Sequence, residues 1–154
     1  MNRQALFCDG TDAYVSPTEP EAGQNIQLWF RTAKNDVDEV TLQYRIGEEG
    51  SYSTAPLRKI ISRGEFDYYN ISRTMREGVL RYRFVIRSGD EVCYYNKWGD
   101  HDNEPQEYYD FRITPGFSVP DWAKGAVMYQ IYVDRFCNGD PCNDVETGEY
   151  SYIG

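Results

Sequence analysis

Apolar residues recur at every second position in three separate runs of the chain, and this alternation constrains the fold more than any other feature. Successive side chains of a β-strand point to opposite faces, so a two-residue period places the apolar side chains on one face. The three runs therefore predict strands that bury one face in a common core. The apolar sets are Ile26, Leu28 and Phe30; Val40, Leu42, Tyr44 and Ile46; and Leu80, Tyr82, Phe84 and Ile86.

Turn-forming residues separate these runs at AKND (33–36), GEEGS (47–51) and SGDE (88–91). The last of them predicts a hairpin whose two-residue loop is Gly89-Asp90. Short strands separated by such turns predict an all-β fold, an immunoglobulin-like antiparallel sandwich. A length of 154 residues allows one well-buried domain and is too short for two large ones.

The opposite faces of the three runs carry one large aromatic side chain among planar hydrogen-bonding groups. Such a face is either a platform for a ligand or a solvated surface on which guanidinium groups cover the tryptophan. The residues concerned are Trp29, Arg31, Gln43, Arg45, Arg81 and Arg83.

A second aromatic concentration lies in EVCYYNKWGDHDNEPQEYYDF (91–111). Sugar rings stack their C–H faces on aromatic planes while amides bind the hydroxyl groups, so this segment predicts a carbohydrate-binding site. Protein interfaces also favour Tyr and Trp, so an assembly surface is the alternative. The candidate sugar ligands are Tyr94, Tyr95, Asn96 and Trp98.

Composition argues against several classes of partner. With 16 basic and 25 acidic residues the formal charge is −9, which repels nucleic acid and anionic membrane surfaces. No stretch reaches the roughly 18 apolar residues of a membrane span, and no signal peptide is evident. We therefore expect a cytoplasmic protein, or an extracellular one if a presequence has been removed. The four cysteines have neither the density of a disulfide scaffold nor the spacing of a zinc site.

The pattern changes at ITPGFSVPDWAKG (113–125), where proline and glycine predict a linker. The run 126–133 that follows is almost continuously apolar, which is typical of a buried parallel strand. It leads to NGDPCND (138–144), whose side chains offer oxygen atoms of the kind that calcium prefers. The alternative for this loop is a solvated turn. The candidate metal ligands are Asn138, Asp140, Asn143 and Asp144.

The segment PDWAKGAVMYQIYVDRFCNGDPCND (120–144) resembles the start of the catalytic barrel in the alpha-amylase superfamily of glycoside hydrolases, particularly the neopullulanase, cyclomaltodextrinase and maltogenic amylase group. Val133 departs from the resemblance, because the family usually has proline there. The upstream part resembles the N-terminal domain of the same group, through Asp67-Tyr68-Tyr69 and through residues 81–95.

The resemblance implies a carbohydrate-binding-module-like β-sandwich over residues 1–115, a linker over 116–121 and the start of the catalytic (β/α)8 barrel over 122–154. The barrel part would comprise the first strand and loop of an incomplete barrel. In the family the 138–144 loop binds calcium together with a GGD segment, which would begin at or after Gly154. The calcium site is therefore expected to be incomplete in this chain.

The implied function is that of the N-terminal segment of a retaining glycoside hydrolase acting on alpha-1,4-glucans or cyclodextrins. The family's catalytic carboxylates lie on later barrel strands, so no catalytic residue is assigned here and the chain alone is expected to be inactive. The N-domain would bind starch-like sugar or shape the active site. The alternative is an assembly domain that builds a homodimer without touching sugar. A stand-alone immunoglobulin-like binding protein would leave the 138–144 loop unexplained.

Overall fold

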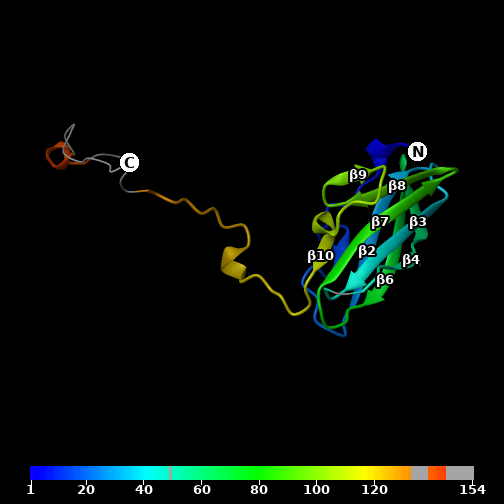
Figure 1. The fold of residues 1–154 in the computed structure, drawn as a ribbon, viewed down its shortest axis with the longest axis horizontal. Coiled ribbons are helices and arrows are strands. Elements are labelled where there is room, and N and C mark those ends of the chain that lie inside the picture. The colour runs from blue at the N-terminus through cyan, green and yellow to red at the C-terminus, as the bar shows by residue number, and fades with distance from the viewer. Residues whose placement is uncertain (49, 133–138, 145–154) are drawn as a thin grey trace, which may run out of the picture. The chain divides into compact units, whose positions relative to one another are not determined.

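The structure, a computed structural model, describes residues 1–48, 50–132 and 139–144 (Figure 1). The chain divides into two compact units, Met1–Ser118 and Val119–Gly154. The division falls inside the predicted linker 116–121. The assignment of residues 1–115 and 122–154 to separate domains stays a prediction.

Strands dominate the described part of the first unit. Two short 3-10 helices accompany them, η1 (Arg3–Ala5) and η2 (Glu107–Tyr109). The strands are β1 (Val15–Ser16), β2 (Asn25–Ala33), β3 (Glu39–Ile46), β4 (Ser53–Pro56), β5 (Arg58–Arg63), β6 (Phe66–Thr74), β7 (Leu80–Ser88), β8 (Glu91–Asn96), β9 (Gly99–His101) and β10 (Phe111–Ile113).

The strands form two antiparallel sheets that pack face to face (Figure 1). One sheet has the order β1-β2-β6-β5, and the other has the order β4-β3-β7-β8-β9, with β10 also pairing with β7. Strand β7 pairs with β10 over its first residues and with β8 over its later ones. This arrangement confirms the predicted all-β antiparallel sandwich.

The core lies between the sheets and consists of the alternating residues that the sequence predicts. Phe30 of β2 and Phe84 of β7 meet across the gap, with ring centroids 4.6 Å apart. Tyr95 packs edge-on against Phe30, and Phe111 stacks on Tyr82. Nine of the predicted core side chains are almost fully buried: Ile26, Leu28, Phe30, Val40, Leu42, Leu80, Tyr82, Phe84 and Ile86.

The predicted hairpin at 88–91 is present. Ser88 of β7 pairs with Glu91 of β8, which leaves Gly89 and Asp90 as a two-residue loop. Gly89 has a φ of 58°, as the first position of a type II′ hairpin turn requires.

The outer face of the second sheet is neither solvated nor open as a ligand platform. Arg83 is only 3% exposed, because the segment that leads into η2 and β10 covers it. The Arg83 guanidinium lies 4.5 Å from the centre of the Tyr52 ring and 3.6 Å from the Asp110 carboxylate. Arg45 forms an ion pair of 2.9 Å with Glu107. The arginines therefore hold down a covering segment that alternation alone could not predict.

The second unit contains two short 3-10 helices among its described residues, η3 (Asp121–Ala123) and η4 (Pro141–Asn143). The strand predicted over 126–133 is not formed over its described part, residues 126–132. Val127 and Met128 are 95% and 88% exposed. A parallel strand needs neighbouring strands to take up its backbone hydrogen bonds and cover its faces, and no described strand pairs with this segment.

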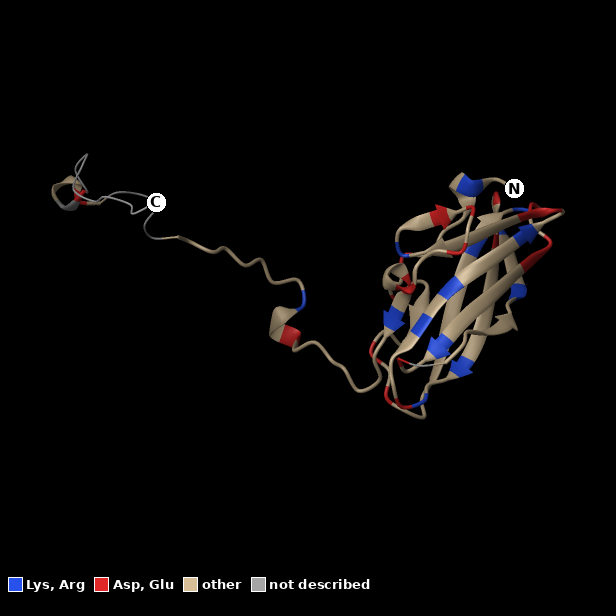
Figure 2. Cartoon of the chain, in the orientation of Figure 1, with Lys and Arg blue, Asp and Glu red and all other residues tan. Residues whose placement is uncertain are grey.

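Charged residues are sorted by position in the sandwich. Figure 2 shows Lys and Arg mostly along the strands and Asp and Glu mostly in the loops and turns.

Within the described ranges, no helix has the length and apolar character needed to cross a membrane.

Asp67 is an exception among the acidic residues, because it lies within a strand, β6, and its carboxylate is completely buried. It accepts hydrogen bonds from the Asn35 backbone N–H (2.8 Å) and the Ser62 hydroxyl (2.5 Å), and it forms an ion pair with Lys59 (2.5 Å). Burial alone would raise the pKa of Asp67, but these partners outweigh it and lower that pKa. Asn35 has a φ of 54°, so the carboxylate also holds a left-handed turn residue in place.

Replacing Phe84 with Ala should lower the free energy of unfolding by about 3–5 kcal/mol, because the ring is fully buried and its loss leaves a cavity between the sheets. Denaturant unfolding followed by circular dichroism measures the change. Ile60→Ala is the control, since Ile60 is 55% exposed on β5 and its truncation should cost about 0.5 kcal/mol or less. A loss below about 1 kcal/mol for Phe84→Ala would place Phe84 outside the core.

Replacing Asp67 with Asn should lower the free energy of unfolding by about 1–3 kcal/mol near neutral pH. The reason is that an uncharged amide cannot replace the carboxylate in all three of its contacts. The pKa of Asp67 is lowered in the folded state, so the carboxylate's stabilisation is present above the unfolded pKa of about 3.9 and is lost as the pH falls through the folded value. The free energy of unfolding should be measured for the parent and for Asp67→Asn at about pH 7 and about pH 3. The difference between the two proteins should be smaller at the lower pH.

The matched control is Asp12→Asn, because Asp12 is exposed. This variant should differ little from the parent at either pH. A gap for Asp67→Asn that is equally large at both pH values would contradict the proposed role of the Asp67 charge.

Candidate functional site

The turn between β8 and β9 is built around a buried amide. Asn96, the last residue of β8, is fully buried, and its Oδ1 accepts the Trp98 backbone N–H at 2.9 Å. The same oxygen lies 3.1 Å from Nε2 of His101 in β9. Gly99, with a φ of 109°, allows the chain to reverse. Asn96 therefore sets the backbone position of Trp98.

Three aromatic side chains gather beside this turn. The Trp98 and Tyr109 ring centroids are 4.2 Å apart with the planes tilted by 43°, and Tyr108 packs edge-on against Tyr109 at 5.2 Å. The Lys97 ammonium lies 5.3 Å from the centre of the Tyr108 ring. Trp98 is 67% exposed and Tyr108 is 74% exposed, whereas Tyr109 is half-buried. We call Trp98, Tyr108 and Tyr109 the aromatic patch.

The aromatic patch is held by polar contacts beneath it. The Lys97 backbone N–H donates to the Tyr109 carbonyl at 3.3 Å, which joins the β8–β9 turn to η2. The next residue, Asp110, is fully buried and accepts the Tyr52 hydroxyl at 2.5 Å. Burial, together with this hydrogen bond, raises the pKa of Tyr52 to about 12, so the hydroxyl remains a donor at neutral pH. The patch therefore rests on a segment that is anchored to the second sheet.

The four predicted sugar-binding residues have different positions. Trp98 is exposed, as sugar stacking requires. Tyr94 is half-buried and lies opposite His101 in the β8–β9 pairing. Tyr95 points into the core against Phe30, and Asn96 is enclosed in the turn, so neither side chain is available to a sugar.

The structure adds Tyr108 and Tyr109, which were not among the predicted sugar ligands. The pair of tyrosines in EYYD, placed between an acidic residue and a core strand, was the available signal. The contact between Tyr109 and Trp98 depends on how the chain folds back between them, which no local sequence pattern predicts.

The predicted metal ligands lie only partly within the described residues. Asn138 lies outside them, as does the side chain of Asn143. Asp140 caps η4, with Oδ1 accepting the Cys142 backbone N–H at 3.0 Å. The Asp144 backbone N–H donates to the Pro141 carbonyl at 3.4 Å. Among the described residues no group of three or more His, Cys, Asp and Glu side chains lies close enough to hold a metal.

Comparison with known proteins identifies the first unit. Residues 1–115 match the family described as alpha amylase, N-terminal ig-like domain. A cyclomaltodextrinase from Geobacillus thermopakistaniensis (strain MAS1) is 33% identical over 153 residues, covering 92% of this chain and 26% of the relative. A maltogenic alpha-amylase from Bacillus acidopullulyticus is 34% identical over 157 residues, covering 94% of this chain and 26% of the relative.

A solved cyclomaltodextrinase structure has a similar fold, with a TM-score of 0.63 and 25% identity, covering 96% of this chain and 26% of that one. The chain thus spans about a quarter of the length of these relatives. Because the family match covers residues 1–115 of 154, the chain belongs to the alpha-amylase family through its N-terminal immunoglobulin-like domain.

Proposed function

We propose that this chain is the N-terminal part of a retaining glycoside hydrolase that acts on alpha-1,4-glucans or cyclodextrins, and that its sandwich binds the sugar. The observation that carries the sugar-binding role is the aromatic patch, in which two strongly exposed rings stand on an anchored support. The relatives named cyclomaltodextrinase and maltogenic alpha-amylase support the choice of substrate class.

The chemistry of the aromatic patch suits a neutral sugar. A glucose ring has one apolar C–H face, which loses little hydration when it stacks on an indole or phenol plane. The Lys97 ammonium and the Tyr108 hydroxyl stand beside these planes and supply polar groups for sugar hydroxyls. Because the support is anchored before binding, little ordering of the patch opposes association.

In a retaining hydrolase one carboxyl group protonates the glycosidic oxygen and another attacks the sugar. We assign neither role to a residue of this chain. Its contribution would be to hold the glucan near the catalytic domain. We expect the protein in the cytoplasm, or outside the cell if a presequence is removed.

The alternative function is assembly of a homodimer through the N-domain. Exposed Trp and Tyr side chains are also typical of the centres of protein interfaces, so Trp98 and Tyr108 suit this role as well. Sugar titration and self-association separate the two functions.

Replacing Trp98 with Ala should lower the affinity of this chain for maltoheptaose or β-cyclodextrin by about ten-fold or more, because the largest stacking plane is removed. Titration calorimetry gives the affinity, and circular dichroism confirms the fold. Trp122→Ala is the matched control, since Trp122 is a second strongly exposed tryptophan, 78% exposed, in the other unit.

Sugar binding at the patch is contradicted if the parent binds neither sugar, or if Trp98→Ala binds both as tightly as the parent. Sedimentation should be measured on the same proteins. A self-associating parent that becomes monomeric in Trp98→Ala while retaining its sugar affinity would establish the assembly function instead.

We also propose that the 138–144 loop contributes to a calcium site in the complete enzyme. Carboxylate and amide oxygens are the ligands that calcium prefers, and Asp140 and Asp144 supply two negative charges. The Asp140 cap on η4 gives part of the loop a defined conformation. Bound calcium would neutralise the two carboxylates and fix the end of the loop.

Calcium should bind weakly to this chain and more tightly to the complete enzyme. Affinity rises with the number of charged ligands and with loop rigidity, and a complete barrel would add both. Calorimetry on the two proteins measures the difference, with Asp140→Asn of the complete enzyme as a test of the loop. Equal affinities in both proteins would refute the incomplete site, and a complete enzyme that binds no calcium would remove the role of these residues.

A further inference from the structure

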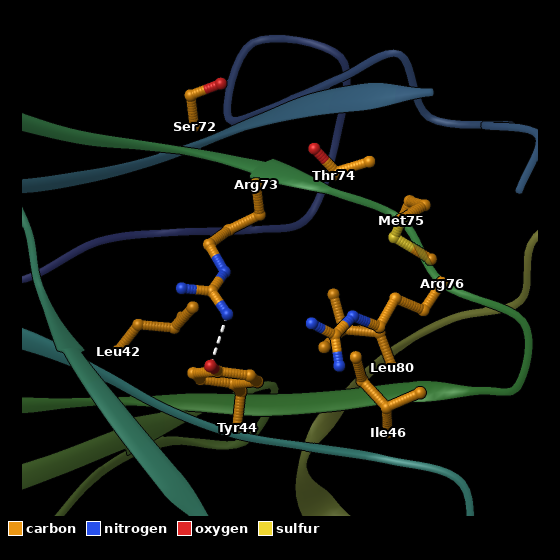
Figure 3. A pocket seen from close by; sticks show the side chains of 9 residues that line it. All are labelled: Leu42, Tyr44, Ile46, Ser72, Arg73, Thr74, Met75, Arg76 and Leu80. Atoms are coloured by element: carbon orange, nitrogen blue, oxygen red, sulfur yellow. Dashed lines mark hydrogen bonds between the residues drawn. The ribbon is translucent and has the colours of Figure 1, made fainter. Parts of the chain in front are cut away.

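A cleft with a volume of about 260 Å³ opens between the two sheets at one end of the sandwich (Figure 3). It forms where the inner face of β3 ceases to be covered: Leu42 is fully buried, whereas Tyr44 and Ile46, further along the same face, are only half-buried. We call it the arginine cleft. It is lined by Leu42, Tyr44 and Ile46 of β3, Ser72, Arg73 and Thr74 of β6, Met75 and Arg76 beyond β6, and Leu80 of β7.

The floor of the arginine cleft is apolar and well supported. Leu42, Met75 and Leu80 are 0%, 3% and 4% exposed. Met75 is held by two backbone hydrogen bonds of 2.8 Å, one from the Gly23 N–H to its carbonyl and one from its N–H to the Gln24 carbonyl. An apolar group that enters the cleft would therefore meet a surface that does not need to rearrange.

Two guanidinium groups stand over this floor. Arg73 lies 4.2 Å from the centre of the Tyr44 ring and donates a hydrogen bond to the Tyr44 hydroxyl. Arg76 follows the end of β6 and extends into the same space (Figure 3). An adjoining hollow of about 240 Å³ shares both arginines and also includes Arg45.

Neither hollow has a carboxylate among its lining residues. Within the described part of the chain, no ion pair is formed by Arg73 or Arg76, whereas Arg45, Arg81 and Arg83 all pair with acidic residues. Two cations that share a cleft without an acidic partner repel each other, and an anion bound between them would relieve that repulsion.

We propose that the arginine cleft binds a small organic anion, namely a carboxylate or phosphate monoester carried on an apolar or aromatic group. The planar guanidinium fork matches the oxygen atoms of either group, and the apolar floor takes the carbon part of the ligand. A bare inorganic ion would leave the half-buried Tyr44 and Ile46 side chains at the cleft uncovered. This site is separate from the aromatic patch, and the proposal does not depend on sugar binding.

Phenyl phosphate is a suitable probe, with inorganic phosphate and benzyl alcohol as its charged and apolar halves. In a two-dimensional NMR titration of this chain, phenyl phosphate should shift the Arg73 and Arg76 Nε–H signals and the Leu80 amide, with a Kd in the roughly millimolar range. Inorganic phosphate should bind at least about ten-fold more weakly, and benzyl alcohol should give no saturable shift. Raising the salt concentration should weaken phenyl phosphate binding.

Arg76→Met should weaken phenyl phosphate binding by about ten-fold without affecting the fold, because Arg76 is exposed. Arg73→Met should weaken phenyl phosphate binding as much. If Arg73→Met unfolds because it loses the contact with Tyr44, Arg76→Met alone provides the test. Arg63→Met is the matched control, an exposed arginine of β5 outside the cleft.

The proposal is overturned if phenyl phosphate gives no saturable shift. It is also overturned if Arg76→Met and Arg63→Met bind equally well, or if inorganic phosphate binds as tightly as phenyl phosphate.

Discussion

The contact between Phe30 and Phe84 across the two sheets is the constraint on which the rest of the structure depends. Both rings are fully buried, and they lie at the centre of the two longest strand pairings, β2 with β6 and β3 with β7. A slip of one residue in either pairing would turn an entire apolar stripe toward water. The core therefore fixes the strand register, and the register decides which polar side chains occupy the outer faces.

On the second sheet the outer face needs its own cover, because the register places Arg45 and Arg83 there at positions that the 102–110 segment crosses. Buried guanidinium groups are stable only with nearby partners. The Pro105 carbonyl accepts a hydrogen bond from Arg83, and the Asp110 carboxylate forms an ion pair with it at 3.6 Å. The same contacts bring Tyr109 against Trp98. The position of the aromatic patch thus follows from the burial of the Arg83 guanidinium under the 102–110 segment.

Local patterns predicted the parts of the fold that depend on local chemistry. Alternation gave the inward faces of β2, β3 and β7, and Gly89-Asp90 gave a hairpin, because period and turn type are encoded by adjacent residues. The Trp98–Tyr109 contact depends on how the 102–110 segment folds back, and the arginine cleft joins strands that are distant in sequence, so neither was predicted. The burial of Tyr95 and Asn96 was not predicted, because a strand's alternation says neither which face will be covered nor which side chain a turn will enclose.

The exposed segment 126–132 gains meaning from the same reasoning. An alternating strand can bury one face and leave the other in water, but Val127, Met128, Tyr129 and Ile131 leave no polar face for solvent. Such a segment is stable as a strand only where both of its faces are covered, as in a parallel barrel surrounded by helices. The sequence of this segment is therefore suited to the proposed barrel strand.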